Sequence, residues 1–381
     1  MSVEEQLIKT RRSLHQIPEV AGEEVKTREF IRSFIFQETN NIQIDYDNEF
    51  GIIAKYHYHR KAPTIAFRAE MDGLPLQDKK ECSYQSVHKG NNHACGHDAH
   101  MAIILHLLNH VDQSDYSINI LFIFQSSEEV FAGAKRLIQP LLSYSIDYLF
   151  ALHVTPNLYA RYFSLSSDVM LAANYSLELT LKLTSGHVAG KADLMALLAS
   201  IYRFQEGYCN ESQSVKVTKI ETNGYYNINP STVKLFVNFR GKNKDINHEG
   251  FAAFLEHIIS KHDRVISVEH RTVSDYPSLK NDERLNQIAS EIFKKKFGAE
   301  FVLPCPFIMS SDDFAFYSNE LTNVKCCYYF IGSYMGDDID VHTERFDIDE
   351  NCLYYGYESF KAIVEVLSKS SERHLQSRIE N

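Results

Sequence analysis

The stretch "SINILFIFQSSEEVFAGAKRLIQPLLSYSIDYLFALHV", residues 117–154, places an amphipathic segment between two short apolar runs. The runs 117–124 and 147–154 have the length and the β-branched and aromatic content of buried strands. Residues 132–142 between them have helical spacing. Because a helix that joins two buried strands is the usual connection of a parallel pair, this stretch predicts an α/β fold.

The same alternation continues on both sides of that stretch. Residues 3–37 predict two helices separated at Pro18, and strands follow at 51–58 and 64–67 before a helix at 99–111. From residue 277 to the end of the chain, buried strands and helices resume. We therefore expect a mainly parallel sheet with helices on both faces.

A different pattern begins near residue 173. Residues 174–186 alternate apolar and polar side chains, and helix candidates at 192–204 and 249–262 are interleaved with further alternating strands. The order β-α-β-β-α-β predicts a small α+β domain with one exposed sheet face. Since 381 residues favour two compact units, we expect a discontinuous catalytic domain, 1–172 and 277–381, interrupted by an inserted domain, 173–276.

The composition is that of a globular protein, with 44% hydrophobic residues, 23% charged residues and a formal net charge of −11. This charge argues against a nucleic-acid binder or a partner for anionic membranes. The N-terminal segment lacks the apolar core of a secretory signal, and no run approaches the roughly 20 apolar residues of a membrane span. Seven scattered cysteines do not resemble a disulfide framework, so we expect the reducing cytoplasm.

Polar side chains with catalytic chemistry follow the predicted strands. Loops converge at the carboxyl ends of strands in open α/β sheets, so residues far apart in sequence can meet there. The candidates are Asp72, Glu128, Glu129, His153 and His342.

The segment "NNHACGHDAHMAIILHLL", residues 91–108, adds Cys95 and His97. On a helix these two side chains would point roughly 200° apart. We therefore expect both to lie in the turn before the helix, facing one centre. We assign His93, His100 and His106 to helix packing, supporting contacts or the surface.

Thiolate, imidazole and carboxylate together suit zinc or another borderline divalent metal. These ligands are more than one catalytic zinc takes, so a pair of metals bridged by a thiolate or carboxylate is the better interpretation. Of the adjacent Glu128 and Glu129, one would bind metal and the other would act as the base. Taken alone, the acidic pair could be a solvated surface and His153 a core histidine.

At these residues the sequence resembles the co-catalytic metal aminoacylase and carboxypeptidase superfamily. It is most similar to the N-acyl-amino-acid amidohydrolase branch, which includes hippurate hydrolases, auxin-conjugate hydrolases and N-acetyl-diaminopimelate deacetylases. The resemblance extends over residues 6–365. Its motifs are "LHQIPEVAGEEVKT", "FRAEMDGLP", "HACGHDAH", "SSEEVFAGAK", "LHVTP", "SSDDFAFY" and "HTERFDIDE".

The resemblance implies a role for each candidate. Cys95 would bridge two divalent metals, zinc in preference to manganese or cobalt. His97 and His153 would complete one metal site, and Glu129 and His342 the other. Glu128 would be the general base, and Asp72 would support the ligands.

The resemblance also implies that the inserted domain is a lid that forms a homodimer. Gly186–His187 would reach across the interface to stabilise the oxyanion, and Asn227 and Arg240 would bind substrate. This part departs from the family pattern: the Pro-His pair after Gly-His is missing, and "NINPS" (227–231) replaces Asn-Val-Ile-Pro-Asp. "QSSEE" replaces Gln-Pro-Ala-Glu-Glu, and Thr343–Glu344 replaces Ser-Pro.

The function implied is hydrolysis of an amide bond in an N-acyl amino acid or a small peptide-like conjugate. An alternative is a catalytically weak relative that binds a metal or metabolite, which the altered inserted domain favours. The complete ligand set beside Glu128 favours the enzyme. A structural zinc protein fits poorly, because structural zinc sites are closed four-ligand shells.

Overall fold

A computed structural model describes residues 1–130, 132–187, 194–336 and 339–379 of the chain. The chain forms two compact units. Unit 1 comprises Met1–Ser167, Asn281–Cys305 and Phe316–Asn381, and unit 2 comprises Asp168–Lys280 and Pro306–Ala315. Each unit is described by itself below.

Unit 1 is built on an eight-stranded sheet with the order β1-β2-β4-β3-β5-β16-β6-β15. The central strands β4, β3, β5 and β16 are parallel. On one side of them β2 pairs antiparallel with β4, and on the other side β6 pairs antiparallel with β16. The strands are β1 Ile42–Asn48, β2 Gly51–Tyr56, β3 Thr64–Glu70, β4 Asn119–Gln125, β5 Tyr148–Thr155, β6 Phe163–Leu165, β15 Val302–Pro304 and β16 Lys325–Gly332. The mainly parallel α/β sheet expected from the sequence is confirmed.

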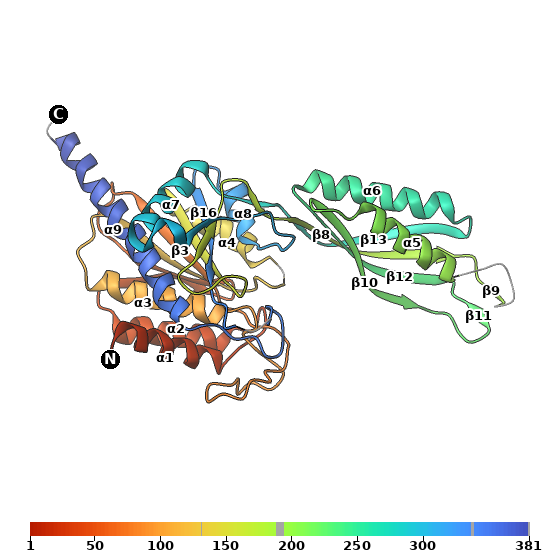
Figure 1. The fold of residues 1–381 in the computed structure, drawn as a ribbon, viewed down its shortest axis with the longest axis horizontal. Helices are drawn as coiled ribbons and strands as arrows, with labels where there is room; N and C mark the ends of the chain where they lie inside the picture. The colour runs from red at the N-terminus through yellow and green to blue at the C-terminus, as the bar shows by residue number, and fades with distance from the viewer. Residues whose placement is uncertain (131, 188–193, 337–338, 380–381) are drawn as a thin grey trace. The chain divides into compact units, whose positions relative to one another are not determined.

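Helices cover this sheet (Figure 1). They are α1 Val3–His15, α2 Val25–Glu38, α3 His97–Asp112, α4 Gly133–Leu141, α7 Glu283–Phe297, the 3-10 helix η1 Ala299–Phe301, α8 Phe314–Glu320 and α9 Asn351–Ile379. Buried apolar residues of α1, α3, α7 and α9 share one core with alternate residues of the strands, such as Phe67, Phe122 and Phe150. The intervening residues, such as Ile123 and Ala151, are also buried, so both faces of the sheet are covered.

The strands of the opening stretch form as predicted, because their apolar residues are buried on both sides. The sequence did not predict β1. Its residues "IQIDYDN" are mostly polar, and the burial pattern shows a strand with a largely exposed surface. It pairs with β2 alone at the end of the strand order, where polar side chains are tolerated.

Unit 2 contains a four-stranded antiparallel sheet with the order β10-β12-β8-β13 and two helices. These elements are β8 Ala173–Leu183, α5 Leu194–Tyr208, β10 Gln213–Thr222, β12 Thr232–Gly241, α6 Lys244–Lys261 and β13 Val265–Tyr276. The short strands β9 Gly186–His187 and β11 Ile228–Asn229 form one ribbon, and β7 Val169–Leu171 and β14 Leu279–Lys280 form another. The predicted order β-α-β-β-α-β is present.

The alternation of apolar and polar residues along the strands of unit 2 explains why two helices pack against one face of its sheet. Alternate apolar residues of β8 and β12, among them Leu179 and Leu235, pack against Leu197 of α5 and Phe254 of α6. Both helices therefore cover the same face of the sheet (Figure 1). The predicted helix at 192–204 corresponds to α5, although residues 192 and 193 lie outside the described part of the chain.

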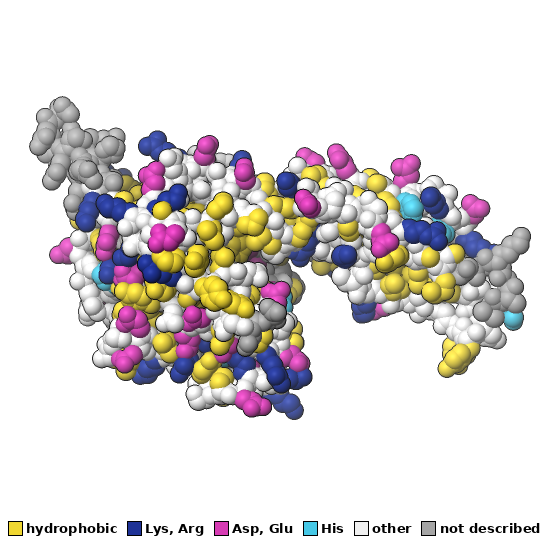
Figure 2. Space-filling view, in the orientation of Figure 1, with side chains coloured by type: hydrophobic (Ala, Val, Ile, Leu, Met, Phe, Trp, Pro, Cys, Tyr) yellow, Lys and Arg dark blue, Asp and Glu magenta, His cyan; other side chains and the backbone are white. Residues whose placement is uncertain are grey.

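The surface carries mixed charge. On the face in view, acidic and basic side chains are interspersed over both units (Figure 2). Among the described residues, no helix combines the length and apolarity that crossing a membrane requires.

Candidate metal centre

Cys95 and His97 are placed by a turn at Gly96. Gly96 has φ 84°, a left-handed conformation that favours glycine, and it immediately precedes α3. A Cβ atom at this position would lie 2.3 Å from Val154 Cγ2, so glycine also permits the close approach to β5. Cys95 precedes the helix as expected, but His97 is its first residue, so the prediction that both precede the helix is wrong for His97.

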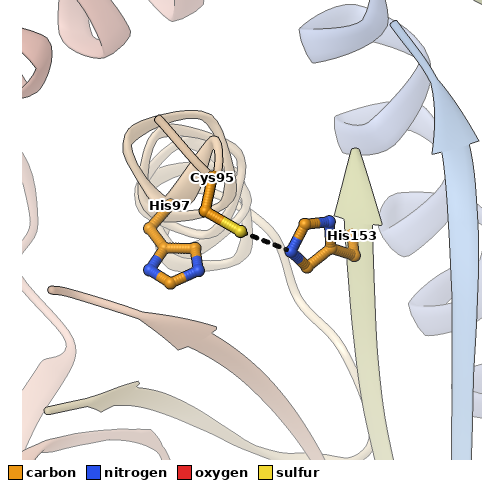
Figure 3. A group of neighbouring side chains, drawn as sticks. All are labelled: Cys95, His97 and His153. Atoms are coloured by element: carbon orange, nitrogen blue, oxygen red, sulfur yellow. Dashed lines mark hydrogen bonds between the residues drawn. The ribbon is translucent and has the colours of Figure 1, made fainter. Parts of the chain in front are cut away.

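The rings of His97 and His153 are both oriented by backbone carbonyls. His97 Nδ1 donates to the carbonyl oxygen of Asp72 at 2.8 Å, and His153 Nδ1 donates to that of Val154 at 2.7 Å. With Nδ1 engaged by a carbonyl oxygen, Nε2 of each ring is the nitrogen that remains to bind a metal. Figure 3 shows Cys95 and His97 at the entry to the helix, with the sulfur atom pointing at the ring of His153.

Cys95 stands at the junction of two ligand groups. Its Sγ lies 3.4 Å from His153 Nε2 and 3.3 Å from His342 Nε2. Cys95, His97 and His153 form one group whose ligand atoms lie within 4.8 Å of one another, and Cys95, Glu129 and His342 form another. A thiolate shared by two groups matches the geometry of a bridging ligand.

Backbone hydrogen bonds bring the second group into place. His342 N donates to the carbonyl oxygen of Ala94 at 2.7 Å, and His342 itself has φ 62°. Glu129 N donates to Asp72 Oδ2 at 3.0 Å. Asp72 is buried just beyond β3, and it thus holds both Glu129 and the ring of His97.

Glu128 completes the cluster. One of its carboxylate oxygens lies within 4.8 Å of ligand atoms of His97 and Glu129. It follows Ser127, a non-glycine residue with φ 62°. Backbone strain of this kind concentrates at functional sites, where surrounding contacts hold it in place.

The electrostatics of the centre favour a cation. Burial and the carboxylates of Glu129 and Glu128 raise the pKa of the Cys95 thiol well above its ordinary value. Burial lowers the pKa of His153 to about 3. Burial alone would also lower the pKa of His97, but its contact with Asp72 and the nearby carboxylates raise it to about 10. The cluster therefore has an excess of negative charge that a divalent cation would neutralise.

The donor atoms fit a metal ion. His97 Nε2, Asp72 Oδ1 and Glu129 Oε1 are buried without a hydrogen-bond partner among the described residues, although Glu129 Oε1 lies 3.1 Å from His342 Nε2. Buried polar atoms of this kind are costly unless something binds them. Thiolate, imidazole and carboxylate donors suit zinc or a similar divalent metal.

His100 is a supporting residue whose specific role the sequence did not reveal. Its Nε2 accepts from Val154 N at 3.0 Å, so its Nδ1 carries the proton and donates to Glu70 Oε2 at 2.7 Å. Both ring nitrogens are thereby occupied, and the ring lies edge-on to His153 with centroids 4.6 Å apart. Burial would raise the pKa of Glu70, but the charge of Arg68 and the hydrogen bond from His100 hold it well below its ordinary value.

An ion-pair network centred on the buried side chains of Arg11 and Asp98 adjoins the Cys95 turn. Asp98 accepts from Arg11 Nε at 2.8 Å and from His15 Nδ1 at 2.6 Å, and Arg11 also contacts Asp347 and Glu350. The sequence motifs contain His15 and Asp98, but only the structure shows that they meet. The network ties α1, the start of α3 and the segment before α9 together.

The remaining predicted residues belong to unit 2. His187 lies in β9 opposite Ile228 of β11, and Asn227 is exposed just before β11. Arg240 in β12 donates through Nε to Asn238 and through Nη1 to the Met309 carbonyl oxygen at 2.7 Å. His187 and Asn227 thus lie in or next to the ribbon of β9 and β11, whereas Arg240 lies in the four-stranded sheet.

Comparison with known proteins identifies the family of the chain. Residues 66–366 match peptidase family M20/M25/M40. The chain belongs to this family. The resemblance stated from the motifs is therefore confirmed, and with it the assignment of the chain to the amide-hydrolysing M20 enzymes.

Two curated M20 relatives show how far the similarity extends. The N-acetyl-L-cysteine deacetylase of Bacillus subtilis is 29% identical over 96% of this chain and 89% of that protein. The N-acetyldiaminopimelate deacetylase of Priestia megaterium is 38% identical, but the alignment spans only 49% of this chain and 50% of that protein.

Solved structures of the M20 type share the fold. A dinuclear metal-binding peptidase of the M20 family from Bacillus subtilis superposes with a TM-score of 0.81 at 23% identity, covering 96% of this chain and 98% of that one. An aminohydrolase from Staphylococcus aureus superposes with a TM-score of 0.82 at 22% identity, covering 96% and 97%.

Proposed function

We propose that this protein is a cytoplasmic di-metal amidohydrolase that removes the acyl group from an N-acyl amino acid. The observation that carries the proposal is the convergence of two ligand groups on Cys95 Sγ, with Glu128 beside them. The family membership and the relatives named as N-acetyl amino acid deacetylases support the reaction class.

In this proposal Cys95 would be shared by two divalent ions, preferably zinc. His97 and His153 would hold one ion, and Glu129 and His342 would hold the other. Asp72 orients the ligands through His97 Nδ1 and the Glu129 backbone. When bound, the ions supply Lewis acidity to the scissile carbonyl and to a water molecule.

Glu128 moves the proton. Its carboxylate lies close enough to His97 and Glu129 to face the same centre without being needed as one of the five ligands. It accepts a proton from the attacking water and delivers it to the leaving amide nitrogen, which departs as the free amine of the amino acid. A carboxylate is suited to both steps because it returns to its ionised form at the end.

The surroundings of Arg240 support the proposal that the substrate has a free carboxylate. Its Nε and Nη1 donate to Asn238, Met309 and Ser311, and burial lowers its pKa. None of these partners carries a negative charge, so the guanidinium has no carboxylate partner among the described residues. An anionic group of the substrate would supply the missing charge. We assign Asn227 to the same substrate-binding role.

We propose that residues 173–276 act as a lid and dimerisation domain on a catalytic domain of residues 1–172 and 277–381. In a homodimer, His187 would serve the active site of the partner subunit by donating to the oxyanion. Its exposure on the short ribbon of β9 and β11 is consistent with such a role.

The test is the Glu128→Gln variant, loaded with zinc and assayed on N-acetyl, N-benzoyl and dipeptide substrates. Turnover should fall by about 10²–10⁴-fold, the usual contribution of a general base, and the metal content should not change. The matched variant Glu129→Gln should lose metal as well as turnover. Near-native turnover in Glu128→Gln would refute the proposed base.

A second candidate is a weakly active relative that binds metal or a metabolite. The altered motifs around His187 and Asn227 favour it, because they affect the residues proposed to contact substrate. The same substrate panel separates the two candidates: a fully metal-loaded wild-type protein without turnover on any substrate would favour this second candidate.

A further inference from the structure

The loop that carries Glu128 begins with a strained turn. Ser127 has φ 62° and Ala132 has φ 50°, both left-handed values that cost a residue with a Cβ about 1–2 kcal/mol each. Gly133 N donates to the Ser127 carbonyl oxygen at 3.0 Å, which closes the loop. A Cβ at Gly133 would lie 1.7 Å from the Ser126 carbonyl oxygen, so the closure is tight. Something must hold Ser127 in this conformation.

Glu24, distant in sequence, contacts this turn directly. Glu24 Oε1 accepts from Ser127 N at 2.9 Å and from Ser126 Oγ at 2.7 Å. Because Ser126 Oγ gives its proton to Glu24, the 2.8 Å contact between the two serine hydroxyls requires Ser127 Oγ to donate. One carboxylate oxygen thus fixes both residues that precede Glu128.

The side chain of Glu24 does not cap its own helix, and its backbone contacts are with Glu24 itself and Gly22. Glu24 occupies the N-cap position of α2, yet its side chain makes no capping hydrogen bond to that helix. It is 2% exposed, and burial together with the charge of Asp72 raises its pKa. A buried carboxyl group beside a second carboxylate destabilises the fold unless its hydrogen bonds compensate. The contacts to Ser126 and Ser127 are those that connect this buried acid to the loop of Glu128.

We propose that Glu24 is a positioning residue that aims the Glu128 carboxylate by holding Ser127 in its left-handed conformation. This inference rests on the proposed role of Glu128 as the base. Glu129 is held independently through its backbone contact with Asp72 at 3.0 Å. Loss of Glu24 therefore displaces Glu128 more than Glu129, and it affects proton transfer more than metal binding. The two serines stand where the family pattern has Pro-Ala, so the hydroxyl contacts belong to this chain.

The test compares Glu24→Ala with Glu24→Gln in the zinc-loaded full-length protein. Glu24→Ala should lower kcat at least about tenfold, since a misplacement of about 1 Å can cost 10²-fold, while KM and metal content stay within twofold. Glu24→Gln keeps an acceptor oxygen and should recover most of the lost kcat. Glu23→Ala, which removes the adjacent exposed carboxylate, should behave like the wild type.

A second variant keeps the inference testable if Glu24→Ala does not fold. Ser126→Ala removes one of the two donors to Glu24 and should lower kcat about threefold or more at unchanged metal content. If Glu24→Ala folds, a kcat equal to that of the wild type would overturn the inference. If it does not fold, a wild-type kcat in Ser126→Ala would overturn it. An inference overturned in this way would leave the proposed function intact as long as Glu128→Gln is inactive. An active Glu128→Gln would instead refute the proposed role of Glu128 as the base, and with it the proposed function.

Discussion

At the scale of single residues, the centre depends on which nitrogen of each histidine carries the proton. His97 and His153 present Nε2 because their Nδ1 atoms donate to backbone carbonyls. His100 differs from them only in its hydrogen bonds: Val154 N donates to its Nε2, and this excludes it as a ligand. Sequence spacing cannot separate these cases, because all three residues are histidines near a strand end or a helix start.

Replacing His100 tests its supporting role. His100→Ala removes the acceptor of Val154 N and the ring that packs on His153, so His153 becomes less well oriented. The affinity for zinc should fall about 10–100-fold, as is typical when the partner of a metal ligand is removed. Competition with a chelator measures it, and the melting temperature is recorded on the same samples.

The matched control is His110→Ala, at the far end of α3, where Nε2 contacts Tyr116 Oη at 2.9 Å. This variant should keep the zinc affinity of the wild type. Equal affinities for the two variants would show that His100 does not support the ligand.

At the scale of elements, α3 is held by its neighbours through polar as well as apolar contacts. His106 of α3 lies 2.9 Å from Thr10 Oγ1 of α1, and its ring packs edge-on against Phe34 of α2. Burial lowers the pKa of His106 to about 4. The imidazole is therefore neutral in the folded protein at pH values where an unfolded chain would already protonate it.

This difference predicts a pH-dependent stability. The folded pKa lies below the unfolded value, so unfolding takes up a proton at acid pH, and stability is lost as the pH falls from about 6.5 toward 4. At pH 4.5 the loss attributable to His106 is about 2 kcal/mol. Thermal unfolding at pH 7 and pH 4.5 should therefore show a fall in melting temperature that is several degrees smaller in His106→Gln than in the wild type. Equal falls in melting temperature for the wild type and His106→Gln would show that His106 does not cause the loss of stability at acid pH.

The elements were predictable to different degrees. Strands β4 and β5 are apolar on both faces, and β8 and β12 alternate, so each has a clear period. The short strands β6, β7, β14 and β15 have two or three residues each, too few to show any period. The start of α3 depends on the conformation of Gly96, and the helix predicted at 99–111 begins two residues after the observed start at His97.

At the scale of the whole molecule, the chain assembles one centre from distant segments. Cys95 and His342 are 247 positions apart in sequence, yet Sγ and Nε2 lie 3.3 Å apart. The strand-end argument and the family resemblance together identified the residues that converge. They did not identify Glu24, Glu70, His100 or Arg11, because such contacts depend on packing that no local pattern encodes. Hydrogen bonds between residues that are 30 to 339 positions apart in sequence had to be seen in the structure.

The central claim is that Cys95 holds two metal ions together. It is tested by counting zinc in the loaded and desalted protein by mass spectrometry, for the wild type, Cys95→Ala and the control Cys82→Ala, whose cysteine is half-buried outside the ligand groups. The wild type and Cys82→Ala should retain about two ions per chain, as expected for a bridged pair, and Cys95→Ala should retain almost none. A Cys95→Ala protein with both ions still bound would contradict the account.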